Sequence, residues 1–481
     1  MTNETKKISP MNALPFSPSP RLPLSPSRHR RPSALVAVLT SAVLSFTTAT
    51  THAQVAKNAV REKVGGIDLV VLKTGVKEVV TIRGSLAAGD ALSPDGNPAL
   101  ADLTGGMLDK GTTKQDKFAI AQLLGGVGAT ISFGTGPSSL NISAKCLRAD
   151  LPLVLGLIAE QLRSPAFSPE EFAKLKKQFA GNYRRQLDET GFRADDSFTR
   201  AVYPLGHPNR QAPSAEILAS AEKITLEEVK AFHAKYYGPA TFRLVLVGDI
   251  DAASAKTEIA KVFAGWTGGE RAPTPAPAKP GAVDAARDQN VFMPEKTNIS
   301  IIWGQATGLR YGDTDTLALR VGTAALGSGF TGRLMANVRD KEGLTYGIGS
   351  YVAGDTFVDG DWRIQGNFAP EMLEKGIAST KRQLTEWYTQ GITDDELAKR
   401  KTGLAGTYKV ALSTTAGMAG TILNTLNRDL ELSFIDQYPA RVGALTKAQV
   451  NGAIKKHLDP EKMVLVKAGT VPGASATPVA K

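Results

Sequence analysis

The stretch SPEEFAKLKKQFAGNYR (168–184) recurs later in the chain, without gaps, as TDDELAKRKTGLAGTYK (393–409). The offset between the two copies is constant, and they are identical at seven of 17 positions. Each copy opens with Ser or Thr followed three residues later by Glu, a capping box that predicts the start of a helix. Since solenoid repeats have periods of only about 20–50 residues, copies that begin as far apart as positions 168 and 393 predict a duplicated domain.

A second, weaker sequence similarity between the two halves supports the duplication. ITLEEVKAFHAKYYGPATFRLVLV (224–247) and LTKAQVNGAIKKHLDPEKMVLV (445–466) both indicate a helix that ends near a Pro and leads into a strand. Strand-like runs also precede the long helices in each half. We therefore predict an α/β fold built of α+β layers. It has two homologous domains, and each domain is a mixed sheet covered by helices.

The clearest internal boundary is TGGERAPTPAPAKPGA (267–282), which is rich in Pro, Ala and Gly. Such a composition favours extended, semi-rigid backbone and provides no face to bury. It predicts a linker between an N-terminal domain (54–266) and a C-terminal domain (283–470). Residues 471–481 are expected to form a flexible tail.

Residues 1–53 have the parts of a secretory signal. The basic cluster at 28–31 (Arg-His-Arg-Arg) precedes a short apolar run at 34–46, and small residues then lead to Ala53. The apolar run is too short to span a bilayer as a helix, and a retained membrane anchor is the alternative. We expect cleavage after Ala53, a periplasmic or secreted protein, and no stable membrane span once the signal is removed.

Composition excludes several classes of protein. Hydrophobic residues make up 42% of the chain and charged residues 21%, which is typical of a globular protein. The formal net charge is +11, and residues 1–53 contribute six basic and one acidic side chain, so about +6 remains for the rest. Those charges are interspersed, whereas nucleic-acid binding requires basic residues clustered on one face. The single cysteine, Cys146, is expected to be buried, and it excludes an intrachain disulfide or a cysteine-based zinc cluster.

The segment ALADLTGGMLDKGT (99–112) resembles the start of the active domain in the pitrilysin/insulinase family of zinc peptidases. In that family a helix carries HxxEH and leads to a motif ending in K-G-T. Here Asp102 is in the first histidine slot, Gly105 in the glutamate slot and Gly106 in the second histidine slot. The family's histidines bind zinc and its glutamate takes a proton from zinc-bound water, but glycine can do neither. The resemblance therefore implies a lost metal site and no cofactor in this chain.

The family's third zinc ligand is a glutamate from a downstream helix, which corresponds here to residues 169–190. Its slot falls on Tyr183 or Arg184, neither of which is a zinc ligand, and Glu189 is a candidate displaced remnant. After the signal, the histidines are His207, His233 and His457. We expect His233 to be structural, and a metal site relocated to these scattered histidines, giving an autonomous peptidase, is the alternative.

The segment LGSGFTGRLMANVRDKEGLTYGIGSY (326–351) resembles the family's second-domain motif, in which a Gly-rich turn and a helix lead through G-L-T-Y-G into a strand. There an arginine and a tyrosine reach the active site of the facing domain, bind the substrate backbone and stabilise the oxyanion. The resemblance implies these catalytic roles for Arg333 and Tyr346, because both side chains are donors suited to developing negative charge. Gly343 is expected to serve the turn and Phe330 the core.

Three nearby aspartates could suggest a calcium site. Asp355, Asp359 and Asp361 lack the ligand spacing of an EF-hand loop. We interpret Asp359-Gly360 instead as the turn of a hairpin over residues 347–368.

Related bacterial enzymes consist of two chains, one with zinc and the other with the arginine–tyrosine pair, and this sequence resembles the second. The resemblance implies a non-zinc subunit of a heteromeric zinc metallopeptidase, which hydrolyses peptides only with a homologous zinc-bearing partner. Zinc is then expected in the partner subunit, and no nucleic acid takes part. The alternative from another class is a catalytically inert structural or peptide-binding subunit.

Overall fold

The computed structural model describes residues 54–271, 273–279 and 287–473. The expected signal (1–53) lies outside these residues, as do parts of the expected linker and tail. No helix in the described stretches is both long enough and apolar enough to cross a membrane.

The first half contains six strands and the helices that precede and cover them. Its strands are β1 (Ala59–Val64), β2 (Ile67–Lys73), β3 (Val79–Leu86), β4 (Thr130–Thr135), β5 (Leu140–Leu147) and β6 (Arg243–Gly248). Its helices are α1 (Val55–Asn58), α2 (Leu100–Gly106), α3 (Lys117–Gly126), α4 (Leu151–Arg163), α5 (Pro169–Leu187), α6 (Thr190–Val202), α7 (Ser214–Lys223), α8 (Leu226–Tyr236) and α9 (Ala252–Val262).

The second half repeats this plan with five strands. They are β7 (Asp288–Phe292), β8 (Ile299–Ala306), β9 (Ile348–Ala353), β10 (Asp361–Phe368) and β11 (Val464–Gly469). The helices are α10 (Thr316–Gly327), the π-helix η4 (Met335–Lys341), α11 (Leu373–Gln390), α12 (Asp394–Ala411), α13 (Thr415–Asn427), α14 (Ser433–Ala444) and α15 (Lys447–His457).

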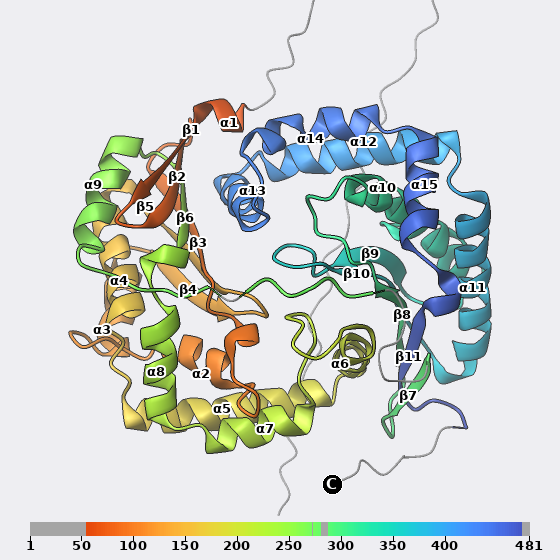
Figure 1. Cartoon of the computed structure of the whole chain (residues 1–481), viewed down its shortest axis with the longest axis horizontal. Coiled ribbons are helices and arrows are strands. Elements are labelled where there is room, and N and C mark those ends of the chain that lie inside the picture. The colour runs from red at the N-terminus through yellow and green to blue at the C-terminus, as the bar shows by residue number, and fades with distance from the viewer. Residues whose placement is uncertain (1–53, 272, 280–286, 474–481) are drawn as a thin grey trace, which may run out of the picture. The chain divides into compact units, whose positions relative to one another are not determined.

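The two halves form mixed sheets of the same design (Figure 1). The strand orders are β1-β2-β6-β3-β5-β4 and β7-β11-β8-β10-β9, so within the described residues every strand of the first sheet except β1 has a counterpart in the second. In each sheet one neighbouring pair is parallel, β2 with β6 and β7 with β11, and the other pairs are antiparallel. The predicted fold class is confirmed. Cys146 on β5 is buried as expected, and burial raises the pKa of its thiol to about 12.

The sequence repeat corresponds to equivalent helices. The offset that relates position 168 to position 393 also relates the start of α5 to that of α12, and both ends of α6 to those of α13. The single helix expected over 169–190 is interrupted, because α5 ends at Leu187 and α6 starts at Thr190. The two predicted capping boxes also differ. At α12 Glu396 completes the box, whereas at α5 the Glu171 carboxylate binds Lys117 at 2.6 Å instead.

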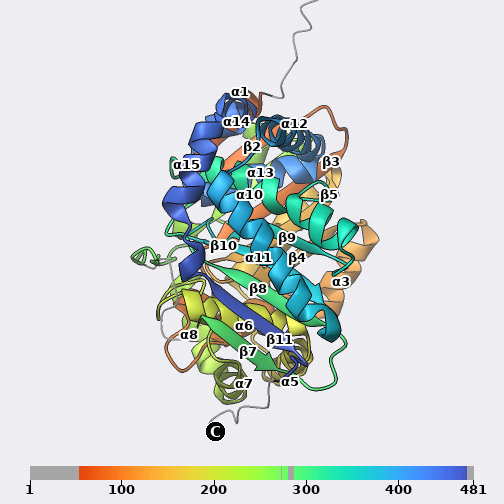
Figure 2. The same ribbon diagram turned by 90° about the vertical axis from the view of Figure 1, so that its right-hand side faces the viewer.

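Each half covers part of the other half's sheet with one helix (Figure 1, Figure 2). Helix α6 packs on the second sheet, where Phe198 shares an apolar cluster with Val466 of β11. Helix α13 packs on the first sheet, where Ile422 shares a cluster with Val245 of β6. Because burial of these apolar faces requires both halves, the two sheets stabilise each other.

A buried ion pair strengthens the contact of α6 with the second sheet. Arg363 of β10 is 6% exposed and binds Asp361 with Nε at 2.5 Å and Nη2 at 2.6 Å. It also pairs with Asp195 of α6 and lies over the Phe198 ring. Burial alone would lower the pKa of Arg363, but the carboxylates of Asp361 and Asp195 outweigh it and raise the pKa. The charge is therefore fully compensated where the two halves meet.

The turn of the β9–β10 hairpin is longer than expected. Seven residues (354–360) separate the paired strands, so Asp359-Gly360 ends the loop and does not form a two-residue turn. Asp359 is held by His207 Nε2 at 3.1 Å and by the backbone N–H of Ala278 at 2.8 Å. Ala278 belongs to the expected linker and is buried, so this part of the linker packs although it forms no helix or strand.

Candidate functional site

The helix that carries the three metal-site slots is α2, and its glycines lie against neighbouring side chains. A Cβ at Gly105 would lie 2.3 Å from Thr135 Oγ1 and 3.1 Å from Leu140 Cδ1. A Cβ at Gly106 would lie 3.1 Å from both Cδ atoms of Leu175 on α5. Contacts this short leave no room for glutamate or histidine without a shift of the surroundings. The glycines therefore do more than remove ligands, because a side chain at either position requires its neighbours to move, and by more at Gly105 than at Gly106.

Asp102, in the first histidine slot, belongs to a half-buried acidic pair with Asp90. Burial raises the pKa of Asp102 to about 6. Burial, and then the charge of Asp102, raises the pKa of Asp90 well above its usual range. The hydroxyl of Tyr237 is close enough that burial and these two charges raise its pKa as well. Because the two carboxylates repel each other, protonation of one relieves the cost of burying both.

The other expected ligand positions do not converge on α2. Tyr183 is buried and its hydroxyl lies 3.4 Å from Ser214 Oγ of α7. Arg184 is exposed and ion-paired on the surface, and Glu189 is exposed ahead of α6. No group of three or more His, Cys, Asp or Glu in the described chain is arranged to hold a metal ion. These residues do not fit the zinc ion that the family's motif binds.

The three histidines lie apart and each has a local partner. His233 Nε2 is 2.8 Å from a backbone carbonyl of α4, and burial lowers the pKa of its ring, so its predicted structural role is confirmed. His207 binds Asp359. His457 Nε2 is 2.9 Å from Asp315. These contacts account for all three rings without a shared ligand.

In the second half, Arg333 is engaged within the chain. Its Nε and Nη2 atoms lie 2.6 and 2.7 Å from the two carboxylate oxygens of Glu396, and Nη2 lies 2.8 Å from the carbonyl of Gly391. Burial alone would raise the pKa of Glu396, but hydrogen bonds from Arg333 and Thr393 outweigh it and lower the pKa. Arg333 thus ties the Gly-rich turn to the start of α12.

Tyr346 is 88% exposed and forms an aromatic–arginine cluster with Phe330 and Arg339. The Arg339 guanidinium lies 5.3 Å from the centroid of the Phe330 ring and 5.7 Å from that of Tyr346. The expectation that Phe330 lies in the core is wrong, because its side chain is 70% exposed. Its ring instead supports the Arg339 guanidinium by a cation–π contact.

Arg339 is the candidate donor that the sequence reasoning missed. It lies seven residues before Tyr346, in the last turn of the π-helix η4. Gly343 has φ +66°, which confirms its turn role and reverses the chain so that the two side chains meet. A π-helix is frequent at functional sites, but nothing in the sequence marks its extra residue per turn. The usable signal was an arginine four residues ahead of the G-L-T-Y-G turn.

Each candidate region adjoins an edge strand. β4 is the edge of the first sheet and ends at Thr135, beside Gly105. β9 is the edge of the second sheet and begins two residues after Tyr346. An edge strand offers unpaired N–H and C=O groups to which an extended peptide can add.

The three aspartates considered for calcium are each satisfied by protein groups. Asp355 binds Arg320 at 2.5 Å. Asp359 binds His207, and Asp361 binds Arg363. They stabilise the hairpin and its contacts with the first half.

Comparisons with known proteins agree with this architecture. Residues 69–203 match the family model described as insulinase (peptidase family M16). Residues 223–404 match the model described as peptidase M16 inactive domain. The two models follow one another along the chain as the two halves do.

The similar proteins have mixed names. A relative from Streptomyces coelicolor named as an uncharacterized zinc protease is 24% identical over 375 residues, covering 76% of this chain and 80% of the relative. The non-peptidase homolog YmxG of Helicobacter pylori is 22% identical over 388 residues, covering 79% of this chain and 86% of the relative. A crystal structure of a peptidase M16 inactive domain from Pseudomonas fluorescens has a TM-score of 0.79 and 28% identity, covering 88% of this chain and 100% of that one.

Proposed function

Because this chain belongs to the insulinase family of peptidases, family M16, we propose that it is the zinc-free subunit of a two-chain peptidase. Its second half contacts a peptide that a zinc-bearing homologue cleaves. The observation that carries the proposal is a contrast between the halves. A side chain in the glycine slots of α2 would require its neighbours to shift, whereas Tyr346 is exposed beside Arg339, whose ion pair with Asp340 at 2.9 Å lies at the surface.

The chemistry of this pair suits a peptide carbonyl. The Tyr346 hydroxyl and the Arg339 guanidinium can both donate to the carbonyl oxygen, and such bonds strengthen as negative charge develops on that oxygen during hydrolysis. Strand β9 can hold the peptide in an extended conformation next to the donors. The partner's zinc would activate the attacking water.

The resemblance implied a donor role for Arg333, and we assign that role to Arg339 instead. Donation by Arg333 would require breaking its bidentate pair with Glu396, which is half-buried. We propose that Arg333 is a positioning residue, because it fixes the Gly-rich turn that presents Phe330 and hence Arg339.

The test is reconstitution with an M16 chain from the same organism that keeps HxxEH. Tyr346→Phe and Arg339→Met should each reduce cleavage of a quenched peptide by roughly a hundred- to a thousandfold, the loss typical of one oxyanion donor. Arg441→Met is the matched control, because the Arg441 guanidinium likewise lies over an aromatic ring, that of Phe434, outside the proposed site. Gel filtration should show that all variants assemble equally.

The second candidate is an inert structural or peptide-binding subunit. The closed α2 helix and the relative named as a non-peptidase homolog both favour it. Under this alternative, Tyr346→Phe and Arg339→Met assemble with the partner and leave its turnover unchanged. That result would remove the catalytic proposal and leave the family assignment standing.

We also propose that residues 1–53 direct export and are removed after Ala53. The support is the order of the basic cluster, apolar run and small residues. N-terminal sequencing of protein from fractionated cells should find Gln54 first in the exported fraction. A cytoplasmic protein that retains Met1 or Met11 would contradict this.

A further inference from the structure

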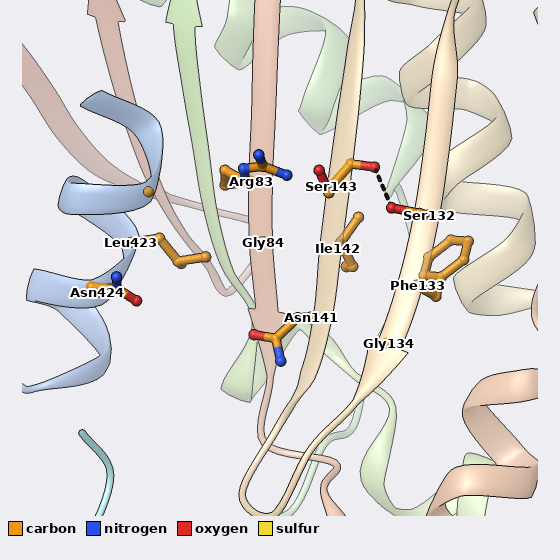
Figure 3. Close-up of a pocket in the computed structure, with 11 residues that line it drawn as sticks. Arg83, Gly84, Ser132, Phe133, Gly134, Asn141, Ile142, Ser143, Leu423 and Asn424 are labelled. Atoms are coloured by element: carbon orange, nitrogen blue, oxygen red, sulfur yellow. Dashed lines mark hydrogen bonds between the residues drawn. The ribbon is translucent and has the colours of Figure 1, made fainter. Parts of the chain in front are cut away.

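A pocket of about 380 Å³ lies between the first sheet and α13 (Figure 3). Strands β3, β4 and β5 form one side of it and α13 the other. None of its lining residues belongs to α2 or to the aromatic–arginine cluster. It is therefore a separate feature from the proposed donor pair.

Among the residues that the structure describes, Arg83 of β3 is the only charged side chain that lines this pocket, and none of the lining residues is Asp or Glu. Arg83 is half-buried, and within the described residues its guanidinium has neither a hydrogen bond nor an ion pair. A guanidinium that is partly withdrawn from water without a partner loses some of its hydration, which an anionic ligand can replace. The pocket thus holds an uncompensated positive charge.

The neighbours of Arg83 on β3 form hydrogen bonds with α13, whereas Arg83 does not. Thr81 and Ser85 lie on the same face of the strand, two positions to either side. Thr81 Oγ1 is 2.8 Å from Thr415 Oγ1, and the Ser85 hydroxyl donates to Asn427 Oδ1 at 2.7 Å, so both are bound to α13. Arg83 lies between these two contacts and faces the pocket instead (Figure 3).

Four further polar residues line the pocket: Ser132, Asn141, Ser143 and Asn424. Ser143 Oγ and the Asn424 side-chain amide have no partner in the described part of the chain. Leu423 of α13 provides apolar surface beside them, whereas the Ile142 side chain lies on the opposite face of β5, in the core. One positive charge, two unpartnered neutral donors and the apolar side chain of Leu423 match a group with a single negative charge on a carbon framework.

We infer that this pocket binds a peptide carboxylate, either the C-terminal carboxylate or an acidic side chain. A single guanidinium balances one carboxylate, whereas phosphate with nearly two charges would remain half-compensated. Ser132 and Gly134 in the lining belong to the edge strand β4, so a peptide added to that edge can place one residue in the pocket. The inference concerns binding by this chain alone and does not need the catalytic proposal.

The binding test uses purified chain and four fluorescein-labelled peptides that share one neutral core. One ends in a free carboxylate, one in an amide, and two amidated peptides carry either Glu or Gln at the centre. Fluorescence anisotropy should show that the free acid, the Glu peptide or both bind roughly tenfold to a hundredfold more tightly than the matched neutral peptide. The first pair tests the C-terminal source and the second tests the side-chain source.

Arg83→Met should remove this preference and keep most of the side chain's length. Asn424→Asp should also remove it, because the new carboxylate pairs with Arg83 across the pocket, and Asn424 is exposed, so folding is not at risk. Lys145→Met is the matched control. Lys145 is an exposed cation on the same face of β5 outside the pocket, and its loss should leave the preference intact.

Three results would overturn the inference. Equal binding of all four peptides by the unmodified chain would show that no carboxylate is recognised. A preference retained in both Arg83→Met and Asn424→Asp would place recognition elsewhere. Displacement of the peptides by an equal concentration of inorganic phosphate would show a phosphate site. None of these results bears on the cleavage experiment with Tyr346→Phe, so the two proposals can fail separately.

Discussion

Arg83 and Arg363 lie on the sheet faces that receive the exchanged helices, but their surroundings are opposite. Arg363 of the second sheet is bound by Asp361 and by Asp195 of α6. Arg83 of the first sheet faces α13, which brings Leu423 and Asn424 but no acid. The same exchange of helices therefore completes an ion pair in one half and leaves a cation available for a ligand in the other.

The contrast extends to the edges of the two sheets. In the first half the region beside β4 contains closely packed glycine positions and a half-buried acidic pair. In the second half the region beside β9 presents Tyr346 to solvent. The two halves thus share a strand order, but the polar groups beside their edge strands differ in exposure and in contacts.

The largest expected difference is between the effects on stability of replacing Arg363 and of replacing Arg83. Arg363→Met should destabilise the protein by about 3–5 kcal/mol, because it leaves Asp361, which is 1% exposed, as an unpaired buried charge. Arg83→Met should change the unfolding free energy by no more than about 0.5 kcal/mol, since no interaction is lost. Urea denaturation followed by circular dichroism measures both. Similar losses in the two variants would mean that Arg83 is structural.

A second test asks whether the α2 region is closed. Gly106→His should cost about 3 kcal/mol, because the new side chain must displace Leu175. Gly181→His is the control, since a Cβ at Gly181 in α5 meets nothing within 4 Å and should change stability little. The triple variant Asp102→His, Gly105→Glu, Gly106→His should bind no stoichiometric zinc by metal analysis. One tightly bound zinc per chain would show that the region can reopen.

A smaller effect on stability is expected from replacing Asp102, one member of the acidic pair. Because the pKa of Asp102 is raised to about 6, the folded chain holds more protons than the unfolded chain between about pH 4 and 6. Stability should therefore fall as pH rises through this window and stay reduced above it. Asp102→Asn should raise the unfolding free energy at pH 8 by about 2 kcal/mol and flatten this decline.

The control for the acidic pair is Asp109→Asn. Asp109 lies shortly after α2, but its side chain is 62% exposed. This variant should keep both the stability and the pH dependence of the unmodified chain. If Asp102→Asn gives the same curve as Asp109→Asn, the two half-buried carboxylates do not oppose folding.

The sequence predicted the duplication and its elements because these depend on local patterns. The constant offset between the two copies also relates both ends of α6 to those of α13. Capping boxes and alternating strands are read from residues a few positions apart. The exchange of α6 and α13 could not be predicted, because an amphipathic helix indicates that it needs an apolar partner and not which sheet provides it.

The sites were harder to predict than the elements. The loss of ligands at Asp102, Gly105 and Gly106 follows from residue type alone. Arg333 forms a bidentate pair with Glu396, 63 residues further along the chain, whereas Arg339 uses one nitrogen to bind its exposed neighbour Asp340, and the sequence alone does not show this difference. Arg83 is an ordinary arginine in a strand-like run, and only the tertiary arrangement shows that its neighbours are paired and it is not.

The exchange of helices also sets the order of events during synthesis. Strand β6 completes the first sheet at Gly248, but the apolar face that includes Val245 is not covered until α13 ends at Asn427. At about 5–20 residues per second, the roughly 180 residues between them take about 10 to 35 seconds to synthesise. During that interval the nascent first half exposes an apolar surface that is prone to aggregation. The nascent chain should therefore depend on a chaperone until α13 has been synthesised.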